Sequence, residues 1–345
     1  MTRARNTADT QTASGGPVSP SIAGKNAIIN GGMDIWQRGT SFAFNNAGAY
    51  TSDRWYCSIS NTAATVSRQA TSDTTNLPTI QYCARLARNS GTSNTGALII
   101  DQSFETVNSI PFAGQTVTMS FYARKGANFS PSAFEVQLRS GTGTDQNDVN
   151  GFTGVAGVCA SNPTLSTTWT RYTVTGTVAA NATQLAVRIT YIPTGTAGAA
   201  DYFEITGVQV ELGSTATPFS RAGGNISGEL ALCQRYLPSL IGASNTILGF
   251  GKNTSQTYVF YKFSVTARVA PTGITTTTPS TDFFVYNQSG TTGRPSSVAF
   301  DFAGTETCVL GTTHTAGSPT IALGQPTMLG ISSGSGYILF TGCEL

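Results

Sequence analysis

Short segments in which apolar and polar residues alternate recur along this chain, and they constrain its fold more than any other feature. In residues 117–123 the odd-numbered positions are apolar, and in residues 172–178 the even-numbered positions are. Successive side chains of a β-strand point to opposite faces of a sheet, so each segment predicts a strand with one apolar face. Because no long helical pattern separates these segments, the chain is predicted to be all-β, with packed antiparallel sheets.

One of these strands carries a local irregularity. Phe203 and Ile205 lead one face, and the parity then shifts at Gly207 so that Val208 and Val210 continue it. A glycine at such a shift predicts a β-bulge. Strands of this kind, in this number, favour two packed antiparallel sheets, as in a β-sandwich or a jelly roll. The clearest candidates are residues 97–101, 116–124, 134–139, 170–178, 185–191 and 202–212.

Charge is scarce in this sequence. Charged residues make up 10% of the chain, against roughly 25% in typical proteins, and the net charge is +2. Such a balance gives no basic field for nucleic acid, and no apolar run is long enough to cross a bilayer. Aromatic residues reach 10%, which argues against disorder. A surface this poor in charge suits a protein whose surface is largely buried in an assembly.

The cysteines show no spacing typical of a metal site. They are widely scattered, without CxxC or zinc-finger spacing, so neither a metal nor a cofactor is expected. A chain of this size does not need covalent bridges to stabilise its core. Buried free thiols are therefore predicted, although pairing of the first two stays open. The six are Cys57, Cys83, Cys159, Cys233, Cys308 and Cys343.

Differences in composition and in the strand or helix pattern divide the chain into four parts. Residues 1–25 are small and polar and predict either a flexible tail or an arm that orders against a partner. Residues 26–224 predict the jelly-roll sandwich, and residues 239–345 predict a second, smaller β-domain. Between them, residues 225–238 predict one short connecting helix, with Ser227 as its cap and Pro238 as its end.

The C-terminal part has fewer strand signals. Residues 257–266, 283–286, 298–302 and 337–341 are strand candidates, and the run TTTTP at 275–279 predicts a loop. Within residues 297–302 the apolar residues take alternate places, which puts Val298, Phe300 and Phe302 on one face. By the same parity, Tyr258 and Phe260 point opposite to Val259 and Tyr261, so one of these two sets must face outward or meet a partner.

Several segments, taken together, resemble a module of bacteriophage structural proteins. The match covers about residues 26–237, in the same order throughout, and nothing after residue 239 takes part in it. The family is that of tail fibres and of head-attached fibres or decorations. The matching segments are NAIINGGMDIWQRGTSF from Asn26, YTSDRW from Tyr50, SFYARKG from Ser120, WTRYTVTGTV from Trp169, DYFEITGVQVELGSTATPF from Asp201 and ELALCQRY from Glu229.

This resemblance implies a fold, a location and partners. It implies a jelly roll similar to carbohydrate-binding modules, virion localisation and, commonly, a homotrimer. The start MTRARNTAD resembles the short N-terminal segment by which many phage fibre-type proteins dock on the particle, so residues 1–25 are expected to be an anchoring arm bound to other virion proteins. The particle-docking residues expected on it are Arg3, Arg5, Val18 and Ile22.

Residues suited to catalysis are few. The single histidine, His314, lies in a loop-like segment without a carboxylate nearby in sequence, and is expected to be exposed. A glycosidase needs two carboxyl groups about 5–9.5 Å apart. Asp145 and Asp148 lie in a glycine-rich turn, where aspartate is expected for backbone reasons. Glu204 and Glu211 are seven residues apart on one strand, roughly 23 Å. The chain is therefore not expected to be an enzyme.

Glycan binding is a more specific alternative than catalysis, because aromatic rings pack against sugar rings. Trp36, Trp55 and Trp169 belong to the segments that carry the resemblance, where core packing is the more frequent use of tryptophan. The C-terminal aromatics are the better ligand candidates, although packing in a neighbouring sheet remains an alternative for them. These candidates are Tyr258, Tyr261 and Tyr286.

The sequence therefore predicts a non-enzymatic virion structural protein, made in the host cytoplasm. A tail fibre or related fibre is expected, docked through its arm and displaying β-domains outward for host attachment. One alternative is a capsid decoration or head-fibre protein. A second is a glycan-binding receptor-recognition module or a depolymerase, with a host surface glycan as partner.

Overall fold

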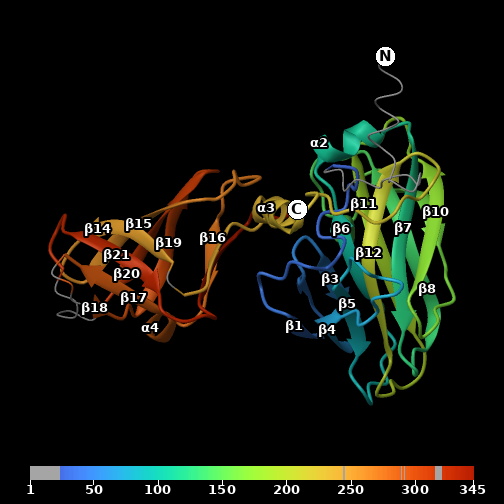
Figure 1. The fold of residues 1–345 in the computed structure, drawn as a ribbon, viewed down its shortest axis with the longest axis horizontal. Helices are drawn as coiled ribbons and strands as arrows, with labels where there is room; N and C mark the ends of the chain where they lie inside the picture. The colour runs from blue at the N-terminus through green and yellow to red at the C-terminus, as the bar shows by residue number, and fades with distance from the viewer. Residues whose placement is uncertain (1–23, 244, 289, 291, 315–320) are drawn as a thin grey trace, which may run out of the picture. The chain divides into compact units, whose positions relative to one another are not determined.

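A computed structural model describes residues 24–243, 245–288, 290, 292–314 and 321–345 (Figure 1). The described chain divides into two compact units. Unit 1 holds the described residues up to Leu230 together with Leu345, and unit 2 holds Ala231–Glu344. Nearly all regular structure in both units is β-strand, as the alternation predicts.

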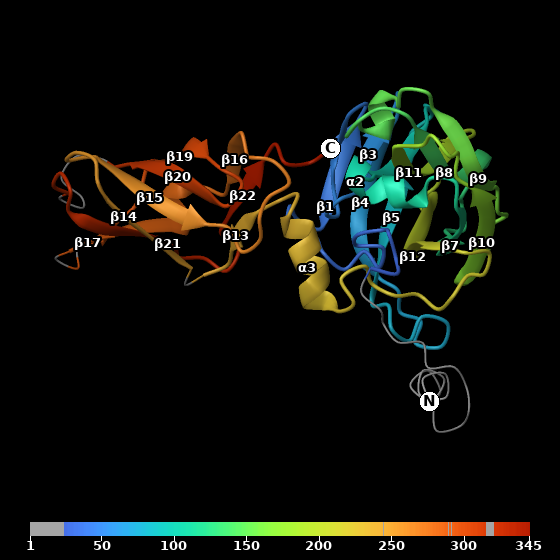
Figure 2. The ribbon, with the colours of Figure 1, turned by 90° about the horizontal axis from the view of Figure 1, so that it is seen from above.

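Unit 1 is a jelly-roll β-sandwich of two antiparallel six-stranded sheets (Figure 2). Neighbouring strands are often distant in sequence, as in the pairing of β12 with both β5 and β7. The first sheet is ordered β1 (Ser41–Asn45), β4 (Ala63–Ala70), β5 (Tyr82–Arg88), β12 (Tyr202–Leu212), β7 (Thr116–Lys125) and β10 (Thr170–Thr177). The second is ordered β2 (Gly48–Tyr50), β3 (Tyr56–Ile59), β6 (Leu98–Ser103), β11 (Gln184–Pro193), β8 (Pro131–Gly141) and β9 (Ala156–Ser161).

The apolar faces of the two sheets form one core. Val117, Met119 and Phe121 of β7 are fully buried in it, and Val187 and Ile189 of β11 come from the other sheet. The odd-numbered parity read from the sequence is therefore confirmed. Short helical segments accompany the strands in the described part of unit 1, among them α2 (Thr106–Ser109), η1 (Ile110–Phe112) and η2 (Asp148–Asn150).

The predicted bulge lies where the parity shifts. The register between β12 and β7 moves from Thr206 opposite Tyr122 to Gln209 opposite Ser120. Gly207 has a φ of +59°, a conformation that other residues adopt with strain. The extra residue lets Val208 and Val210 join the core that Ile205 had entered.

The helix between the β-rich segments is confirmed, but its bounds differ from the prediction. α3 spans Ile226–Gln234, and Asn225 rather than Ser227 caps it, because Asn225 Oδ1 accepts the backbone N–H of Gly228 at 2.9 Å. Ser227 already lies inside the helix. The helix ends before Pro238, which therefore does not terminate it directly.

Unit 2 contains a seven-stranded and a three-stranded antiparallel sheet. The seven-stranded sheet is ordered β18 (Thr292–Gly293), β17 (Phe283–Asn287), β21 (Pro326–Ile331), β14 (Thr246–Gly251), β15 (Gln256–Lys262), β20 (Thr307–Thr313) and β19 (Ser297–Ala303). The three-stranded sheet is ordered β13 (Ser239–Ile241), β22 (Tyr337–Thr341) and β16 (Gly273–Thr276). A short helix, α4 (Pro279–Asp282), precedes β17.

Two local predictions for unit 2 are wrong. Thr275 and Thr276 were expected in a loop, yet they pair with Leu339 and Ile338 of β22. Threonine is favoured in strands, so a threonine run does not by itself indicate a loop. The strand expected over residues 257–266 ends at Lys262.

Each unit has its own apolar core. The core of unit 2 joins side chains such as Val259, Phe283 and Leu310 of the larger sheet to Ile338 and Phe340 of the smaller one. All six cysteines are free thiols, five of them buried and Cys159 partly so, in agreement with the prediction. None of the helices in the described part of the chain has the length and hydropathy that crossing a bilayer requires.

Candidate functional site

The face of the seven-stranded sheet that points away from the core of unit 2 carries a continuous row of apolar side chains. The register places Tyr286 opposite Met328 and Met328 opposite Leu248, and on the other side Phe260 opposite Val309 and Val309 opposite Phe302. We call these six residues the apolar row. They come from β17, β21, β14, β15, β20 and β19, which are consecutive in the sheet. At the usual spacing between strands the row is roughly 24 Å long.

The row is largely open to solvent. Leu248 is 68% exposed, Phe260 51% and Phe302 62%. Val309 is buried because Phe260 and Phe302 flank it. Single exposed apolar residues are ordinary, but a contiguous set of this kind marks an interaction site.

A bulge produces one end of this row. Phe300 pairs with Leu310 and packs against the core, whereas Phe302 pairs with Val309, one register step out of phase. The extra residue in β19 is Asp301, and it turns Phe302 to the outer face. The prediction that Val298, Phe300 and Phe302 share one face is therefore wrong at Phe302.

A second line of residues runs beside the row. Phe250 lies opposite Tyr258, with their ring centroids 6.1 Å apart, and its ring is 5.6 Å from that of Phe260. Lys252 places its ammonium 4.6 Å from the centre of the Tyr258 ring, a cation–π contact. The same line continues from Tyr258 to Gly311 on β20.

The sheet is hollowed at Gly311. No atom lies within 4 Å of the position that a Cβ would take there, so the missing side chain leaves a depression of about 160 Å³. Tyr258 lines one side of it and Ala299 and Asp301 the other. The outer face thus combines a protruding apolar row with one shallow hollow.

The three predicted ligand-binding tyrosines separate. Tyr258 and Tyr286 lie on the outer face, whereas Tyr261 points into unit 2. The Tyr261 ring stacks on Phe340 at 5.4 Å, and its hydroxyl donates to the Ser239 carbonyl at 3.0 Å. Tyr261 therefore packs against the core, as parity opposite to Tyr258 requires. The role of the other two stays a prediction.

Leu248 and Phe250 were not predicted from the sequence. They lie on β14, whose segment TILGFG was not singled out as a strand. Glycines at 249 and 251 interrupt its alternation, although Ile247, Leu248 and Phe250 give a short apolar run that predicts strand or core. The expected docking residues Arg3, Arg5, Val18 and Ile22 lie outside the described residues.

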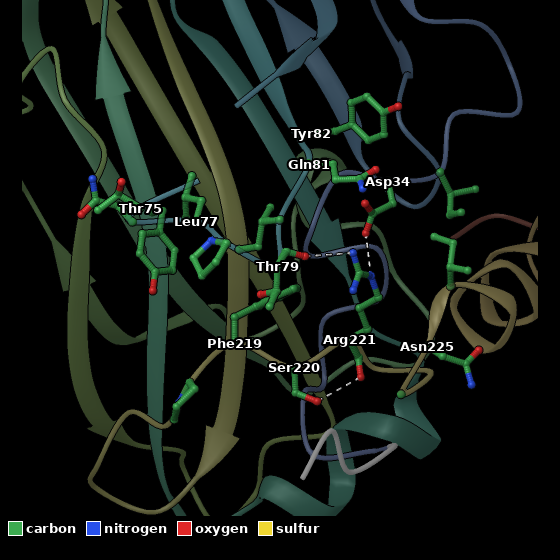
Figure 3. Close-up of a pocket in the computed structure, with 18 residues that line it drawn as sticks. Asp34, Thr75, Leu77, Thr79, Gln81, Tyr82, Phe219, Ser220, Arg221 and Asn225 are labelled. Carbon is green, nitrogen blue, oxygen red and sulfur yellow. Dashed lines mark hydrogen bonds and ion pairs between the residues drawn. The ribbon is translucent and has the colours of Figure 1, made fainter. Parts of the chain in front are cut away.

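Unit 1 contains a groove of about 1080 Å³ (Figure 3). Two connecting segments, residues 75–82 and 218–226, form most of its wall. Leu77, Ile80 and Phe219 supply an apolar part, packed with Trp169 and Tyr122 on the outer side of the first sheet. Amide side chains complete the lining: Asn76, Gln81 and Asn225.

An ion pair braces this groove. Arg221 Nε donates to Asp34 Oδ2 at 2.8 Å, and Arg221 Nη2 donates to the Thr79 carbonyl at 3.4 Å. Figure 3 shows the guanidinium between these two partners. The close approach of Asp34 needs a glycine beside it, because a Cβ on Gly32 would lie 2.8 Å from Asp34 Oδ2. Arg221 thus fixes three segments that are far apart in sequence.

Two of the four candidate catalytic carboxylates, Glu204 and Asp148, form ion pairs with arginines. Buried Glu204 accepts from Arg85 Nη2 at 2.6 Å and from Arg124 Nε. Asp148, expected in a glycine-rich turn for backbone reasons, is buried and lies 3.0 Å from Arg139 Nη1 and 2.9 Å from Arg188 Nε. Carboxylates held in such ion pairs stabilise the packing of the strands that carry them. Among the described residues, no three His, Cys, Asp or Glu side chains are grouped to hold a metal ion.

His314 is buried, not exposed as expected. Its backbone N–H donates to the Ser255 carbonyl at 2.7 Å, which draws the end of β20 onto the hairpin between β14 and β15. Its Nε2 lies 2.9 Å from Thr312 Oγ1. Burial lowers the pKa of this imidazole. The prediction failed because a loop-like sequence does not reveal which distant segment covers it.

The tryptophans of the resembling segments are structural. Trp36, Trp55 and Trp169 are all buried. Trp55 Nε1 donates to the Asn30 carbonyl at 3.1 Å, and Trp36 Nε1 donates to the Met33 carbonyl at 2.8 Å. Their faces are therefore not available as sugar platforms, in line with the use expected for them.

No protein-family model and no curated protein matches the chain. Solved structures similar to part of it include one titled "CBM4 structure and function", at 16% identity and a TM-score of 0.31, over 53% of this chain and 98% of that one. Another is the enzymatically active domain of bacteriophage CBA120 tailspike protein 4, at 16% identity and a TM-score of 0.36, over 57% of this chain and 22% of that one. A third is a putative sugar-binding protein from Bacteroides thetaiotaomicron, at 12% identity and a TM-score of 0.33, over 55% of this chain and 100% of that one.

Proposed function

We propose that this chain is a non-enzymatic structural protein of a bacteriophage particle, a tail fibre or related fibre. Unit 1 is its rigid scaffold and unit 2 its outward interaction module. The location rests on the resemblance of residues 26–237 to phage fibre and decoration proteins. Head decoration is the alternative location within the same class.

The observation that carries this proposal is the network around Asn30. Segments that bear the resemblance, far apart in the chain, meet there. Glu229 Oε1 accepts the Asn30 backbone N–H, Trp55 donates to the Asn30 carbonyl, and Asn30 Nδ2 donates to the Asp53 carbonyl at 3.1 Å. Gly31 packs so tightly that a Cβ would lie 2.1 Å from the Val208 carbonyl oxygen. The shared residues therefore hold a framework together, which supports a scaffold rather than a reaction site.

The charge distribution supports the same proposal. Acidic groups of unit 1 are buried against arginines, as Arg88 and Asp201 are, with both side chains fully buried and 2.8 Å apart. Such pairs fix the geometry of a rigid body, since removing one partner leaves an uncompensated buried charge. A scaffold needs this rigidity to present a second unit.

The test is incorporation into particles. We expect a chain lacking residues 1–23 to fold with unchanged thermal unfolding, yet to be absent from purified particles, because the expected docking residues have been removed. The full-length chain, supplied in the same way, should be incorporated and visible by electron microscopy. Normal incorporation of the shortened chain would show that the arm is not the anchor, and absence of the full-length chain from particles would overturn the proposed function.

A second candidate function is glycan binding in the groove of unit 1. Its mixture of aromatic rings and amide side chains is the chemistry that recognises neutral sugars. Gln81 is an exposed part of this lining, so Gln81→Ala should weaken binding of the protein to host cells without lowering its unfolding temperature. Equal binding by the variant and the parent chain would count against this candidate.

A further inference from the structure

The apolar row needs a covering partner. Its side chains come from six consecutive strands, and three of them, Leu248, Phe260 and Phe302, are each more than half exposed. In unit 2 the three-stranded sheet packs on the opposite face, through Ile338 and Phe340. Contiguous exposed apolar surface of this kind is typical of interfaces between proteins.

We propose that a second copy of this chain covers the apolar row, in a two-fold, face-to-face contact between seven-stranded sheets. This inference deepens the proposed structural role and rests on it only for the statement that copies assemble on a particle. The contact itself is argued from the chemistry and the spacing of the row.

The chemistry of the row favours a protein surface over a sugar. Five of its six side chains have no hydrogen-bonding group of the kind a saccharide requires, Tyr286 being the exception. Interfaces between identical chains have cores that are apolar, poor in charge and rich in aromatic residues and methionine. Three charged side chains border the row: Lys252, Lys262 and Asp301. Asp301 lies close enough to Lys252 to offset its charge, so the face of each copy carries little net charge.

The order of the row makes it complementary to itself. Consider a two-fold axis that runs parallel to the strands and passes between β14 and β15. It places the rows of the two copies face to face, with the order of the strands in one copy opposite to that in the other. Leu248 then faces Phe260 of the second copy. In the same way Met328 faces Val309, and Tyr286 faces Phe302. Each contact occurs twice, as a two-fold interface requires, and a smaller side chain meets a larger one at the centre.

The hollow at Gly311 fits the same arrangement. The axis that pairs the rows lays Phe250 over Tyr258 of the second copy and Pro326 over its Gly311. Pro326 is exposed and lies directly opposite Phe250, on the neighbouring strand β21. A projecting proline ring thus meets a depression of about 160 Å³. One geometry accounts for both the exposed row and the missing side chain beside it.

The test is the solution mass of the full-length protein, measured by light scattering after size exclusion over a dilution series. We expect an even number of chains: two from the two-fold contact alone, or six when the homotrimer that the resemblance implies also forms. The double variant Phe260→Ser and Phe302→Ser should halve that number, because it removes two of the most exposed side chains of the row. Leu212→Ser is the matched control: Leu212 is an exposed apolar residue that belongs to unit 1 and not to the row, and its replacement should leave the mass unchanged.

A second variant keeps the test independent of folding. A Cβ at Gly311 meets no atom of its own chain within 4 Å, so Gly311→Val should leave the unfolding temperature unchanged while it fills the hollow and shifts the assembly towards smaller species. Gly304→Val, which is equally open, is its control. A wild-type mass of one or three chains would overturn the two-fold contact, and so would an unchanged mass in both row and hollow variants. Neither result touches incorporation into particles, which tests the proposed function separately.

Discussion

At the scale of single residues, one buried cluster shows how the few charged side chains of this chain are paired. Arg188 Nε lies 3.4 Å from Asp101 Oδ2 and 2.9 Å from Asp148 Oδ2, so one arginine serves two buried carboxyl groups. Burial, reinforced by the neighbouring Asp148 carboxylate, raises the pKa of Asp101 to about 8. Asp101 therefore stays protonated at neutral pH. Like-charged neighbours in a poorly solvated place cannot both ionise without cost.

This raised pKa sets a pH dependence of stability. Between about pH 4, where an unfolded aspartate ionises, and pH 8, the folded chain holds a proton that the unfolded chain has lost. Stability from this group therefore falls as pH rises through that window. We expect Asp101→Asn, which mimics the protonated form, to gain unfolding temperature relative to the parent chain progressively from pH 4 to pH 8.

Thermal unfolding at several pH values checks this expectation. Glu135→Gln is a suitable control, because Glu135 is a partly exposed acid on β8 of the same sheet. Its difference from the parent chain should change little over the window. A constant difference between Asp101→Asn and the parent chain, from acid to alkaline pH, would contradict the assignment.

At the scale of secondary-structure elements, the bulge in β12 depends on the backbone conformation of a single glycine. Gly207 adopts a φ of +59°, and a Cβ there would lie 2.8 Å from Tyr122 Cδ2 and 2.9 Å from Ile80 Cδ1. Gly207→Ala is expected to destabilise unit 1 by about 1–3 kcal/mol, since it adds strain and crowds two packed side chains. Urea unfolding measures the loss. Gly157→Ala on β9, where nothing lies within 4 Å and φ is not positive, should change stability by less than about 1 kcal/mol.

The two bulges play opposite parts. The one at Gly207 keeps successive apolar side chains of β12 in the core, whereas the one at Asp301 turns Phe302 away from it. Bulges re-aim side chains by changing parity within a strand. The bulge in β12 can be predicted from the sequence, because a glycine stands where the parity shifts. The bulge in β19 cannot be predicted from neighbouring residues, because the pattern Val-Ala-Phe-Asp-Phe-Ala is equally compatible with a regular strand.

At the scale of the whole molecule, the two units have separate cores. Trp55 and Phe121 belong to the core of unit 1, and Phe283 and Phe340 to that of unit 2. Units with their own cores are expected to unfold as separate cooperative transitions. We therefore expect calorimetry of the full-length chain to resolve two transitions.

A core variant identifies them. Phe283→Ala removes a fully buried ring from unit 2, which costs about 3–5 kcal/mol. It should lower the midpoint of one transition and leave the other in place. Phe121→Ala is the matched change in unit 1 and should act on the other transition. If either variant shifted both midpoints equally, the units would be coupled in folding.

The sequence by itself determined what depends on neighbouring residues. Alternation predicts the strand over residues 202–212 with the bounds that β12 has, and a glycine at the parity shift predicts the bulge within it. The all-β class follows in the same way, because side-chain direction in a strand has a period of two wherever the strand lies. Opposite parity also separated Tyr258 from Tyr261 correctly.

Only the tertiary structure decided which faces are covered and which residues meet. It alone shows that Tyr258 rather than Tyr261 faces outward, that Phe302 joins Leu248 and Phe260 on an open face, and that His314 is buried. Asp101 and Asp148 lie side by side although they are 47 positions apart in the sequence. Parity gives two faces without saying which one is buried, since that depends on strand order and on loops from distant parts of the chain.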